Sequence, residues 1–498
     1  MISMIHRRTK IVATLGPATD DPVVLRKIIE AGVDVVRLNF SHGKREDHAR
    51  RAAMVREIAA EVGREVAILG DLQGPKIRVE RFRDGPVELL DGAEFTLDTA
   101  HPEGEGDVNI VGLAYKQLPQ DVEAGSVLLL NDGLIVLTVK RVDGTRIITE
   151  VTIGGTLSDR KGINKQGGGL SAAALTDKDK ADIQTAADLE FDYLAVSFPK
   201  DAADMLEARE LMEMAGGRAG LVAKVERAEA IENLAEIIEA SDVVMVARGD
   251  LAVEVGDAEL PGLQKKIIHD ARERNRVVIT ATQMMESMIS NPVPTRAEVS
   301  DVANAVMDGT DAVMLSAETA SGKYPVKVVE AMDRVCKGAE KHRLTLKSHH
   351  RLDEDFERVD EAIAMATMYT ANHLHVKAIV SFTESGYTGL WMSRIRSGIP
   401  IFAFTRQPAT RRRVCLYRGV YPVPFDIIDR EPADILHDAT ATLIYMKVVE
   451  PGELVIFTKG DFDGIAGGTN TMRVHRVERP RKRIEELSGD LDFGDSGA

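Results

Sequence analysis

Short apolar runs, each ended by polar or charged residues, recur along most of the chain. Runs of this length are typical of buried parallel strands. Helical patterns lie between them; in the first, Leu25, Ile28 and Ile29 share one face, Asp20 or Asp21 caps the start and Gly32 ends it. This alternation predicts a parallel α/β domain. The predicted strands cover residues 10–16, 33–40, 66–72, 191–197, 221–226, 242–248, 277–282 and 311–318.

The number of these strands predicts their arrangement. Eight strand–helix units over about 250 residues are typical of a (β/α)8 TIM barrel. A doubly wound open sheet has a similar alternation and is the alternative. We expect residues 1–72 and 171–346 to form the barrel domain.

Two further domains are predicted by changes in this pattern. Residues 73–170 contain short alternating runs separated by Asp-Gly pairs at 84–85, 91–92, 132–133 and 143–144, a hairpin signal that predicts an inserted all-β domain. The glycines at 167–169 are a candidate hinge. After a polar linker, residues 360–478 predict a C-terminal α/β domain with a helix at 361–374 and strands at 378–382, 401–405 and 454–458. The acidic tail, 479–498, is expected to be disordered.

Composition and charge exclude several classes of function. The formal net charge of −16 argues against binding to nucleic acid or to a membrane surface. No apolar run approaches the roughly 20 residues needed to span a bilayer. The two cysteines, Cys336 and Cys415, form no C-x-x-C motif, so neither a disulfide framework nor a cysteine metal site is expected. We therefore expect a cytoplasmic protein.

Charged residues at two successive strand ends are the main candidate site. Lys224 and Glu226 end one apolar run, and Arg248 and Asp250 end the next. Barrel sites lie at the carboxyl ends of the strands. Two carboxylates there suit a hard divalent cation, and a lysine beside them suits a phosphate. The alternative is a buried Lys–Glu ion pair that only closes the strand end.

Other polar positions have both a functional and a structural interpretation. Arg37, Asn39 and Ser41 alternate along one strand and so share a face, which suits a small anionic or metal-bound ligand, or simply a solvent-exposed end. Thr282, Ser316 and Glu318 also lie at strand ends, where a plain helix cap is the alternative. The hydroxyl-rich turn at 383–388 suits a phosphate or an ordinary cap. The arginines at 411–413 are interpreted as a solvated helix face.

Several longer runs resemble one known family, pyruvate kinase. They read TKIVATLGPAT, VDVVRLNFSHG, GDLQGPKIR, LVAKVERAEAI, VVMVARGDLAVE, TATQMMESMISNPVPTRAEVSDVANAV, DGTDAVMLSAETASGKYP and TESGYTGLWMSRI. The resemblance covers nearly the whole chain. It implies a (β/α)8 barrel, an inserted β domain that closes over its mouth, and a C-terminal α/β domain. It also implies transfer of the phosphoryl group of phosphoenolpyruvate to ADP, which yields pyruvate and ATP.

The same resemblance implies roles for individual residues. Glu226 and Asp250 would hold Mg2+ or Mn2+, and Lys224 would stabilise the charge on the phosphoryl group in flight. The remaining assignments are substrate binding by Arg37, Ala247, Gly249, Asp250 and Thr282, phosphate or nucleotide contacts by Asn39, His42, Arg78 and Lys178, and proton delivery by Ser316 and Glu318.

Two departures from the family pattern lead to further expectations. Asn39, Ser41, Asp71 and the Leu72 carbonyl match a K+ site, but Lys76 stands where those members have glutamate, so we expect no K+ requirement. Tyr387 stands where the family often has an arginine, so the expected effector is a monophosphorylated sugar or nucleotide rather than a bisphosphate. Its phosphate would bind Thr383, Ser385 and Thr388, helped by Arg394, Arg406 or the arginines at 411–413.

The resemblance also implies a homotetramer under allosteric control. Two rival functions remain: a metal-dependent aldolase or lyase that stabilises a pyruvate enolate on the same barrel, and a non-catalytic sensor of phosphorylated metabolites. Formation of ATP from ADP and phosphoenolpyruvate would distinguish them.

Overall fold

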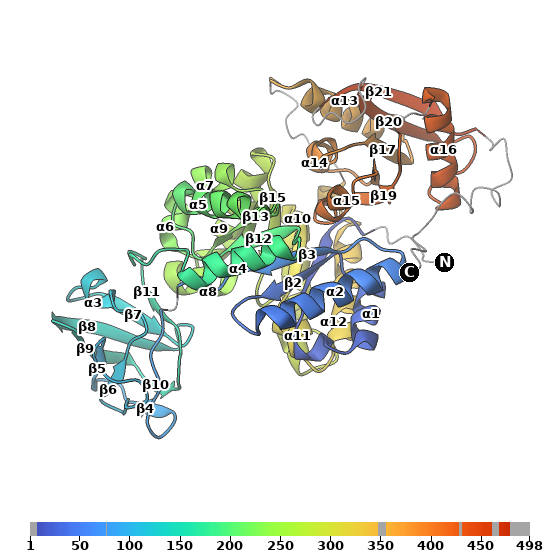
Figure 1. The fold of residues 1–498 in the computed structure, drawn as a ribbon. Coiled ribbons are helices and arrows are strands. Elements are labelled where there is room, and N and C mark those ends of the chain that lie inside the picture. The colour runs from blue at the N-terminus through green and yellow to red at the C-terminus, as the bar shows by residue number, and fades with distance from the viewer. Residues whose placement is uncertain (1–6, 76, 347–354, 428–430, 461–467, 479–498) are drawn as a thin grey trace.

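The computed structural model describes residues 7–75, 77–346, 355–427, 431–460 and 468–478. Three bodies follow one another in space, with the barrel between the inserted domain and the C-terminal domain (Figure 1). No helix in these ranges is long and apolar enough to cross a membrane. Lys76 and the predicted tail lie outside the described residues.

Eight parallel strands form a closed barrel, in the order β1-β16-β15-β14-β13-β12-β3-β2. The TIM barrel prediction is confirmed, and the open-sheet alternative is wrong. All eight predicted strands are present, with bounds that differ from the predicted ones by up to three residues. Their bounds are β1 (Lys10–Thr14), β2 (Val35–Asn39), β3 (Ala67–Asp71), β12 (Tyr193–Val196), β13 (Gly220–Val225), β14 (Val243–Ala247), β15 (Val277–Ala281) and β16 (Ala312–Leu315).

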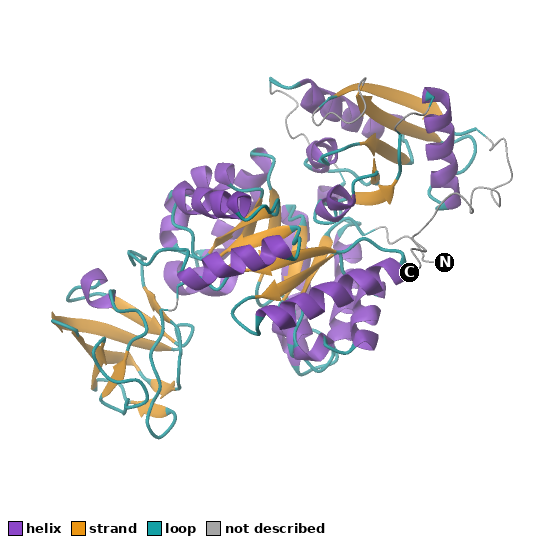
Figure 2. Ribbon diagram, viewed as in Figure 1, coloured by secondary structure: helices purple, strands orange, loops and turns teal. Residues whose placement is uncertain are grey.

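Helices surround these strands because each places one apolar face against them (Figure 2). Asp21 caps the first helix as expected, and Gly63, at φ 70°, ends the second in the left-handed region that glycine tolerates. The helices are α1 (Pro22–Glu30), α2 (Arg45–Val62), α4 (Asp177–Asp188), α5 (Ala202–Met214), α6 (Ala228–Glu232), α7 (Leu234–Ala240), α8 (Arg248–Val255), α9 (Leu260–Glu273), α10 (Arg296–Asp308), α11 (Ala317–Ala320) and α12 (Pro325–Ala339), with 3-10 turns η1 (Pro17–Thr19), η2 (Glu286–Ile289) and η3 (Arg343–Thr345).

The inserted domain is built of β-strands around its own apolar core. Its sheets have the orders β11-β7-β8-β9-β5-β6 and β10-β4. The Asp-Gly pairs at 132–133 and 143–144 join paired antiparallel strands as predicted, but the pair at 91–92 joins β4 and β5, which pair with other strands. The elements are β4 (Val87–Leu89), β5 (Glu94–Asp98), β6 (Ile110–Gly112), α3 (Leu118–Asp121), β7 (Val127–Leu130), β8 (Ile135–Asp143), β9 (Arg146–Ile153), β10 (Gly155–Leu157) and β11 (Ile163–Lys165).

In its described residues, the C-terminal domain is a five-stranded sheet of order β19-β18-β17-β20-β21 with four helices. The three predicted strands are present, but two edge strands were missed because β19 contains two prolines and β21 is largely exposed. The elements are α13 (Val359–Leu374), β17 (Ala378–Phe382), α14 (Tyr387–Ser393), β18 (Ile401–Thr405), α15 (Pro408–Val414), β19 (Val420–Pro424), α16 (Pro432–Tyr445), β20 (Leu454–Gly460) and β21 (Thr469–Arg476).

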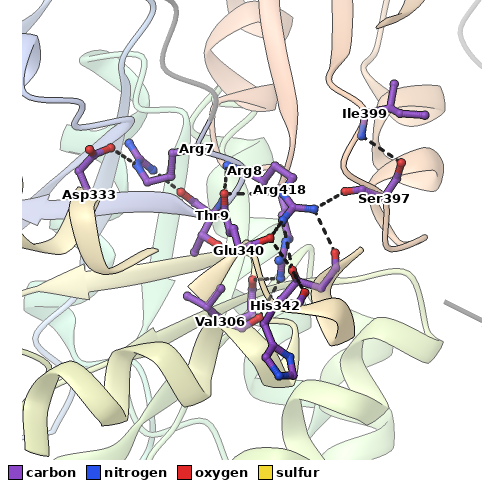
Figure 3. A network of polar contacts seen from close by, with 12 residues as sticks. Arg7, Arg8, Thr9, Val306, Asp333, Glu340, His342, Ser397, Ile399 and Arg418 are labelled. Carbon is purple, nitrogen blue, oxygen red and sulfur yellow. Dashed lines mark hydrogen bonds and ion pairs between the residues drawn. The ribbon is translucent and has the colours of Figure 1, made fainter. Parts of the chain in front are cut away.

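The start of the chain joins the barrel to the C-terminal domain (Figure 3). The backbone N–H of Arg8 donates to Glu340 at 3.0 Å, and the Arg8 carbonyl accepts from Gly419 N–H at 2.9 Å. The Arg8 guanidinium donates to the Thr345 carbonyl at 3.0 Å. In the same network, Arg418 donates to the Val306 carbonyl at 3.1 Å.

The arginines at 411–413 do not form the solvated helix face that the charge run predicted. Arg412 pairs with Asp192 of the barrel at 2.8 Å, Arg411 pairs with Glu65, and Arg413 donates to the Arg218 carbonyl at 2.9 Å. This side of α15 therefore faces the barrel.

Candidate active site

Side chains from four barrel strands, β1, β2, β3 and β13, meet at the carboxyl end of the barrel. Lys224 Nζ lies 3.2 Å from Asp71 Oδ1 and 2.9 Å from Glu226 Oε1. Arg37 Nε lies 2.6 Å from Asp71 Oδ2, and another guanidinium nitrogen of Arg37 donates to Thr14 Oγ1 at 3.0 Å. The strand ends therefore bring together the lysine, the arginine and two of the acids that the sequence singled out.

This cluster perturbs the pKa values of its members. Burial disfavours the charged form of Lys224, but the Asp71 and Glu226 carboxylates outweigh it and raise the lysine pKa. Burial also raises the pKa of Glu226, to about 7, and the nearby Asp250 adds to this shift. For Asp71, burial is outweighed by Arg37 and Lys224, so its pKa falls below the usual value. Such shifts are typical of functional sites.

Glu226 and Asp250 are the candidate metal ligands, and their chemistry fits the predicted ion. Asp250 lies in the first turn of α8, directly after β14, and burial raises its pKa. Among the described residues, no group of three or more His, Cys, Asp and Glu side chains could hold a metal by itself. Mg2+ is commonly held by one or two carboxylates together with substrate phosphate oxygens. The buried Glu226 carboxylate and the half-buried Asp250 carboxylate, which interact with each other, therefore suit an ion that arrives with its substrate.

Thr282 and Gly249 form a second part of the barrel mouth. Thr282 Oγ1 accepts from Gly249 N–H at 2.8 Å and donates to the Ala281 carbonyl at 2.7 Å. Thr282 has φ 64°, and the following Gln283 has φ 54°. Left-handed backbone is uncommon for residues other than glycine, and it tends to occur at functional sites.

Arg248 is not at the site, although it ends an apolar run. It is the first residue of α8, and its guanidinium donates to Asp301 Oδ2 at 2.7 Å and to the Thr282 carbonyl at 2.6 Å. It therefore ties the loop that carries Thr282 to α10.

The expected nucleotide residues lie on two segments beside the mouth. Lys178 Nζ donates to the Phe40 carbonyl at 2.8 Å, which places α4 beside the segment after β2. In that segment Asn39 Oδ1 accepts from Ser41 N–H at 2.9 Å, and His42 is exposed. Arg78 is exposed in the inserted domain, where its backbone forms an antiparallel β-bridge with Gly162.

Ser316 and Glu318 do not extend β16, as the sequence predicted, but begin α11. Glu318 Oε2 accepts from Ser316 N–H at 2.6 Å, and its other oxygen accepts from Met285 N–H at 3.2 Å. Burial raises the pKa of Glu318. The Ser316 side chain makes no cap hydrogen bond, so the plain helix cap is not the reason for a serine here.

The candidate effector turn is internally hydrogen-bonded. Thr383 Oγ1 accepts from Gly386 N–H at 2.9 Å, and the buried Thr388 hydroxyl lies 2.7 Å from that of Thr469. Arg394 was expected to assist here but is buried in an ion pair with Asp311. The arginines at 411–413 contact the barrel, so of the expected arginines Arg406, which pairs with Glu384, remains beside the turn.

Besides Thr14, which contacts Arg37, sequence reasoning missed two residues that contact Lys224 and Glu226. Ser197 Oγ accepts from Lys224 Nζ at 2.7 Å, and the N–H of Phe198 donates to Glu226 Oε2 at 2.9 Å. Both follow β12. A signal was present, because Ser197 is a polar residue at the end of an apolar run, the criterion that identified the other strand ends.

The chain forms a closed parallel barrel that carries a lysine, an arginine and paired carboxylates at its mouth. These features define a barrel enzyme suited to an anionic, metal-bound substrate. Family models make the class specific: one described as the pyruvate kinase barrel domain matches residues 6–329, and one described as the pyruvate kinase alpha/beta domain matches residues 361–475. The chain belongs to the pyruvate kinase family, and the expected family is confirmed.

Individual relatives agree with this assignment over nearly the full length. Pyruvate kinase II of Salmonella typhimurium is 60% identical over 95% of this chain and 99% of its own length. Pyruvate kinase of Haemophilus influenzae is 57% identical over 95% of this chain and 99% of its own. A crystal structure of a pyruvate kinase from Cryptosporidium parvum has a TM-score of 0.88 at 33% identity and covers 95% of this chain and 96% of that one.

Proposed function

We propose that the barrel mouth carries out the pyruvate kinase reaction, transfer of the phosphoryl group of phosphoenolpyruvate to ADP, with Lys224 as its central group. The observation that carries this proposal is the position of Lys224 Nζ between Asp71 and Glu226. Its raised pKa keeps the ammonium charged at neutral pH. A fixed positive charge in a water-poor site stabilises the negative charge of a phosphoryl group in flight.

Arg37, Gly249 and Thr282 are proposed to hold the substrate. The Arg37 guanidinium is fixed by Asp71 and Thr14, which suits a grip on phosphate oxygens. Gly249, Asp250 and Thr282 would surround the carboxylate and the reactive carbon. The Thr282 hydroxyl already accepts one backbone bond and donates another, so substrate would compete for these contacts.

Glu226 and Asp250 are proposed to hold Mg2+ or Mn2+. When bound, the ion would supply positive charge that offsets the negative charge of the substrate oxygens. Mn2+ binding can be measured without turnover by electron paramagnetic resonance in the presence of phosphoenolpyruvate. Glu226→Gln should weaken this binding, and unchanged affinity would contradict the assignment. Glu254→Gln is the matched control, because Glu254 is also buried but contacts Ala228 and Asn164.

Nucleotide contacts are proposed for Asn39, His42, Arg78 and Lys178. The position of Arg78 in the inserted domain supports a lid that brings this arginine to the barrel when it closes. Closure would exclude water and so protect the phosphoryl group from hydrolysis.

Ser316 and Glu318 are proposed to take part in proton delivery to the enolate. Glu318→Gln should then slow proton exchange into pyruvate more than it slows phosphoryl transfer.

We propose that the reaction needs no K+. Three of the four groups expected to bind K+ already have partners: Asp71 pairs with Arg37 and Lys224, the Leu72 carbonyl accepts from Ser197, and Asn39 accepts from Ser41 N–H. An ammonium at Lys76 would repel a nearby K+ by roughly 4 kcal/mol at about 4 Å and an effective dielectric near 20. The test is turnover in tetramethylammonium buffer with and without KCl. Strong activation by KCl would contradict the proposal, whereas Lys76→Glu should create a requirement.

We propose a phosphorylated effector at the turn formed by residues 383–388, with Arg406 as the cationic partner. Calorimetric titration of the wild type and Thr388→Ala with a panel of sugar and nucleotide monophosphates tests this. Identical titrations for every compound would leave the turn as a plain cap.

A homotetramer is proposed for the assembled enzyme. Val293 and Val299, 65% and 37% exposed, lie before and in α10 and suit a subunit contact. Analytical ultracentrifugation should give a particle of four chains.

The free, buried cysteines are consistent with a cytoplasmic location.

The rival functions are less well supported. An aldolase or lyase needs neither the inserted lid nor the nucleotide contacts, and a sensor has no use for costly buried charges. ATP formation from ADP and phosphoenolpyruvate, with and without Mg2+, is the direct test. Absence of ATP with the folded protein would reject the proposal.

A further inference from the structure

We propose that Ser197 is a positioning residue for the reaction, because its hydroxyl fixes the ammonium group of Lys224. This inference rests on the proposed role of Lys224. Ser197 lies directly after β12 and is only 1% exposed. Its Oγ lies 2.7 Å from Lys224 Nζ and 2.7 Å from the Leu72 carbonyl oxygen.

The two contacts of the Ser197 hydroxyl determine its direction. A hydroxyl has one hydrogen to donate and two lone pairs to accept with. The Leu72 carbonyl can only accept, so it takes the hydrogen. A lone pair is then directed to Lys224, which can only donate. The end of β3 thereby sets the orientation of the serine, and the serine in turn orients the lysine.

Ser197 adds a short, directional contact to the contacts that the carboxylate partners make with Lys224. The distance to Ser197 is shorter than those to Asp71 and Glu226, and Asp71 Oδ1 makes no hydrogen bond. Attraction between charges falls off slowly with distance and tolerates many geometries. A hydrogen bond is restricted in both distance and angle. The serine therefore limits where the ammonium lies between the acids.

The neighbouring backbone makes the serine a rigid support. Phe198 has φ 57° and donates its N–H to Glu226 Oε2 at 2.9 Å, so the same corner also orients Glu226. An uncommon backbone geometry of this kind persists when its surroundings determine it strongly. On the other side, a Cβ added to Gly74 would lie 2.8 Å from the Ser197 Cβ, which shows how closely that turn approaches the serine.

The test is the turnover of Ser197→Ala. Loss of a hydrogen bond to a charged group should lower kcat by about 10- to 100-fold. The KM for phosphoenolpyruvate should change little, since Arg37, Gly249 and Thr282 remain. Ser241→Ala is the matched control: this buried serine also donates to a backbone carbonyl, of Ile237, but at the opposite end of the barrel, and kcat should be unchanged.

A double-mutant cycle separates positioning of the lysine from a general structural role. If the serine acts through the lysine, Ser197→Ala should cause no further loss in a Lys224→Met background. Equal fold-losses in both backgrounds would overturn the inference, as would normal turnover of Ser197→Ala beside an impaired Lys224→Met. Near-normal turnover of Lys224→Met by itself would instead overturn the proposed role of the lysine. Circular dichroism of each variant establishes that it is folded.

Discussion

The buried ion pair between Arg394 of the C-terminal domain and Asp311 of the barrel allows a sharp prediction about stability. Their side chains are 1% and 2% exposed. Asp311 also accepts from Val278 N–H at 2.9 Å and Arg418 N–H at 3.3 Å. The surroundings of this ion pair are strongly cationic, as the pKa of Arg272 indicates. Burial lowers that pKa to about 9, and the positive charge of Arg394 contributes to the decrease.

The two partners should therefore differ in what their removal costs. Asp311→Ala leaves Arg394 and its neighbouring arginines without this carboxylate, and such a loss typically costs about 3–5 kcal/mol. Arg394→Met preserves much of the side-chain volume and leaves Asp311 with two backbone donors, close to Arg272 and Arg418. We expect about 1.5–3 kcal/mol, the cost of lost hydrogen bonds to a charged group.

Urea unfolding followed by tryptophan fluorescence measures this difference. Trp391 is the single tryptophan of the chain, and it packs partly buried three residues before Arg394. Arg26→Met is the control: Arg26 forms an exposed ion pair with Glu61, whose loss should cost about 0–1 kcal/mol. A destabilisation by Arg394→Met equal to or greater than that by Asp311→Ala would refute the reasoning.

Two further predictions concern the mouth and the base of the inserted domain. Lys224→Met should remain folded and lose about 3–4 kcal/mol of transition-state stabilisation, measured as kcat; near-normal turnover would contradict the assigned role. Burial raises the pKa of Glu254 from 4.5 to about 7, with Glu229 adding to the shift. The folded protein thus binds the Glu254 proton more tightly than the unfolded chain does. This proton binding contributes stability that is fully present below about pH 4.5 and is lost as the pH rises through about 7. The loss amounts to at most about 3 kcal/mol. Because glutamine is always neutral, the melting temperature of Glu254→Gln should rise relative to the wild type between pH 5 and 8, and a constant difference would contradict this.

Part of the candidate site could be predicted because strand ends are a local property. Apolar runs of a few residues identified the strands, and parallel strands in a barrel must bring their carboxyl ends to one mouth. Asp71, Lys224 and Glu226 meet there as this geometry requires. Ser197 follows the same rule and was overlooked, since one hydroxyl after an apolar run carries a weaker signal than a charge.

The sequence by itself located the eight barrel strands and the inserted β domain, and its motifs identified the family. These depend on periodicity, turn residues and motifs, all of which act between near neighbours. Tertiary structure alone decided which partner each long side chain has. Arg248 turns to Asp301, and Arg394 crosses to Asp311. A guanidinium group can reach any of several acids, and the choice depends on which segments, often far apart in the chain, pack beside it.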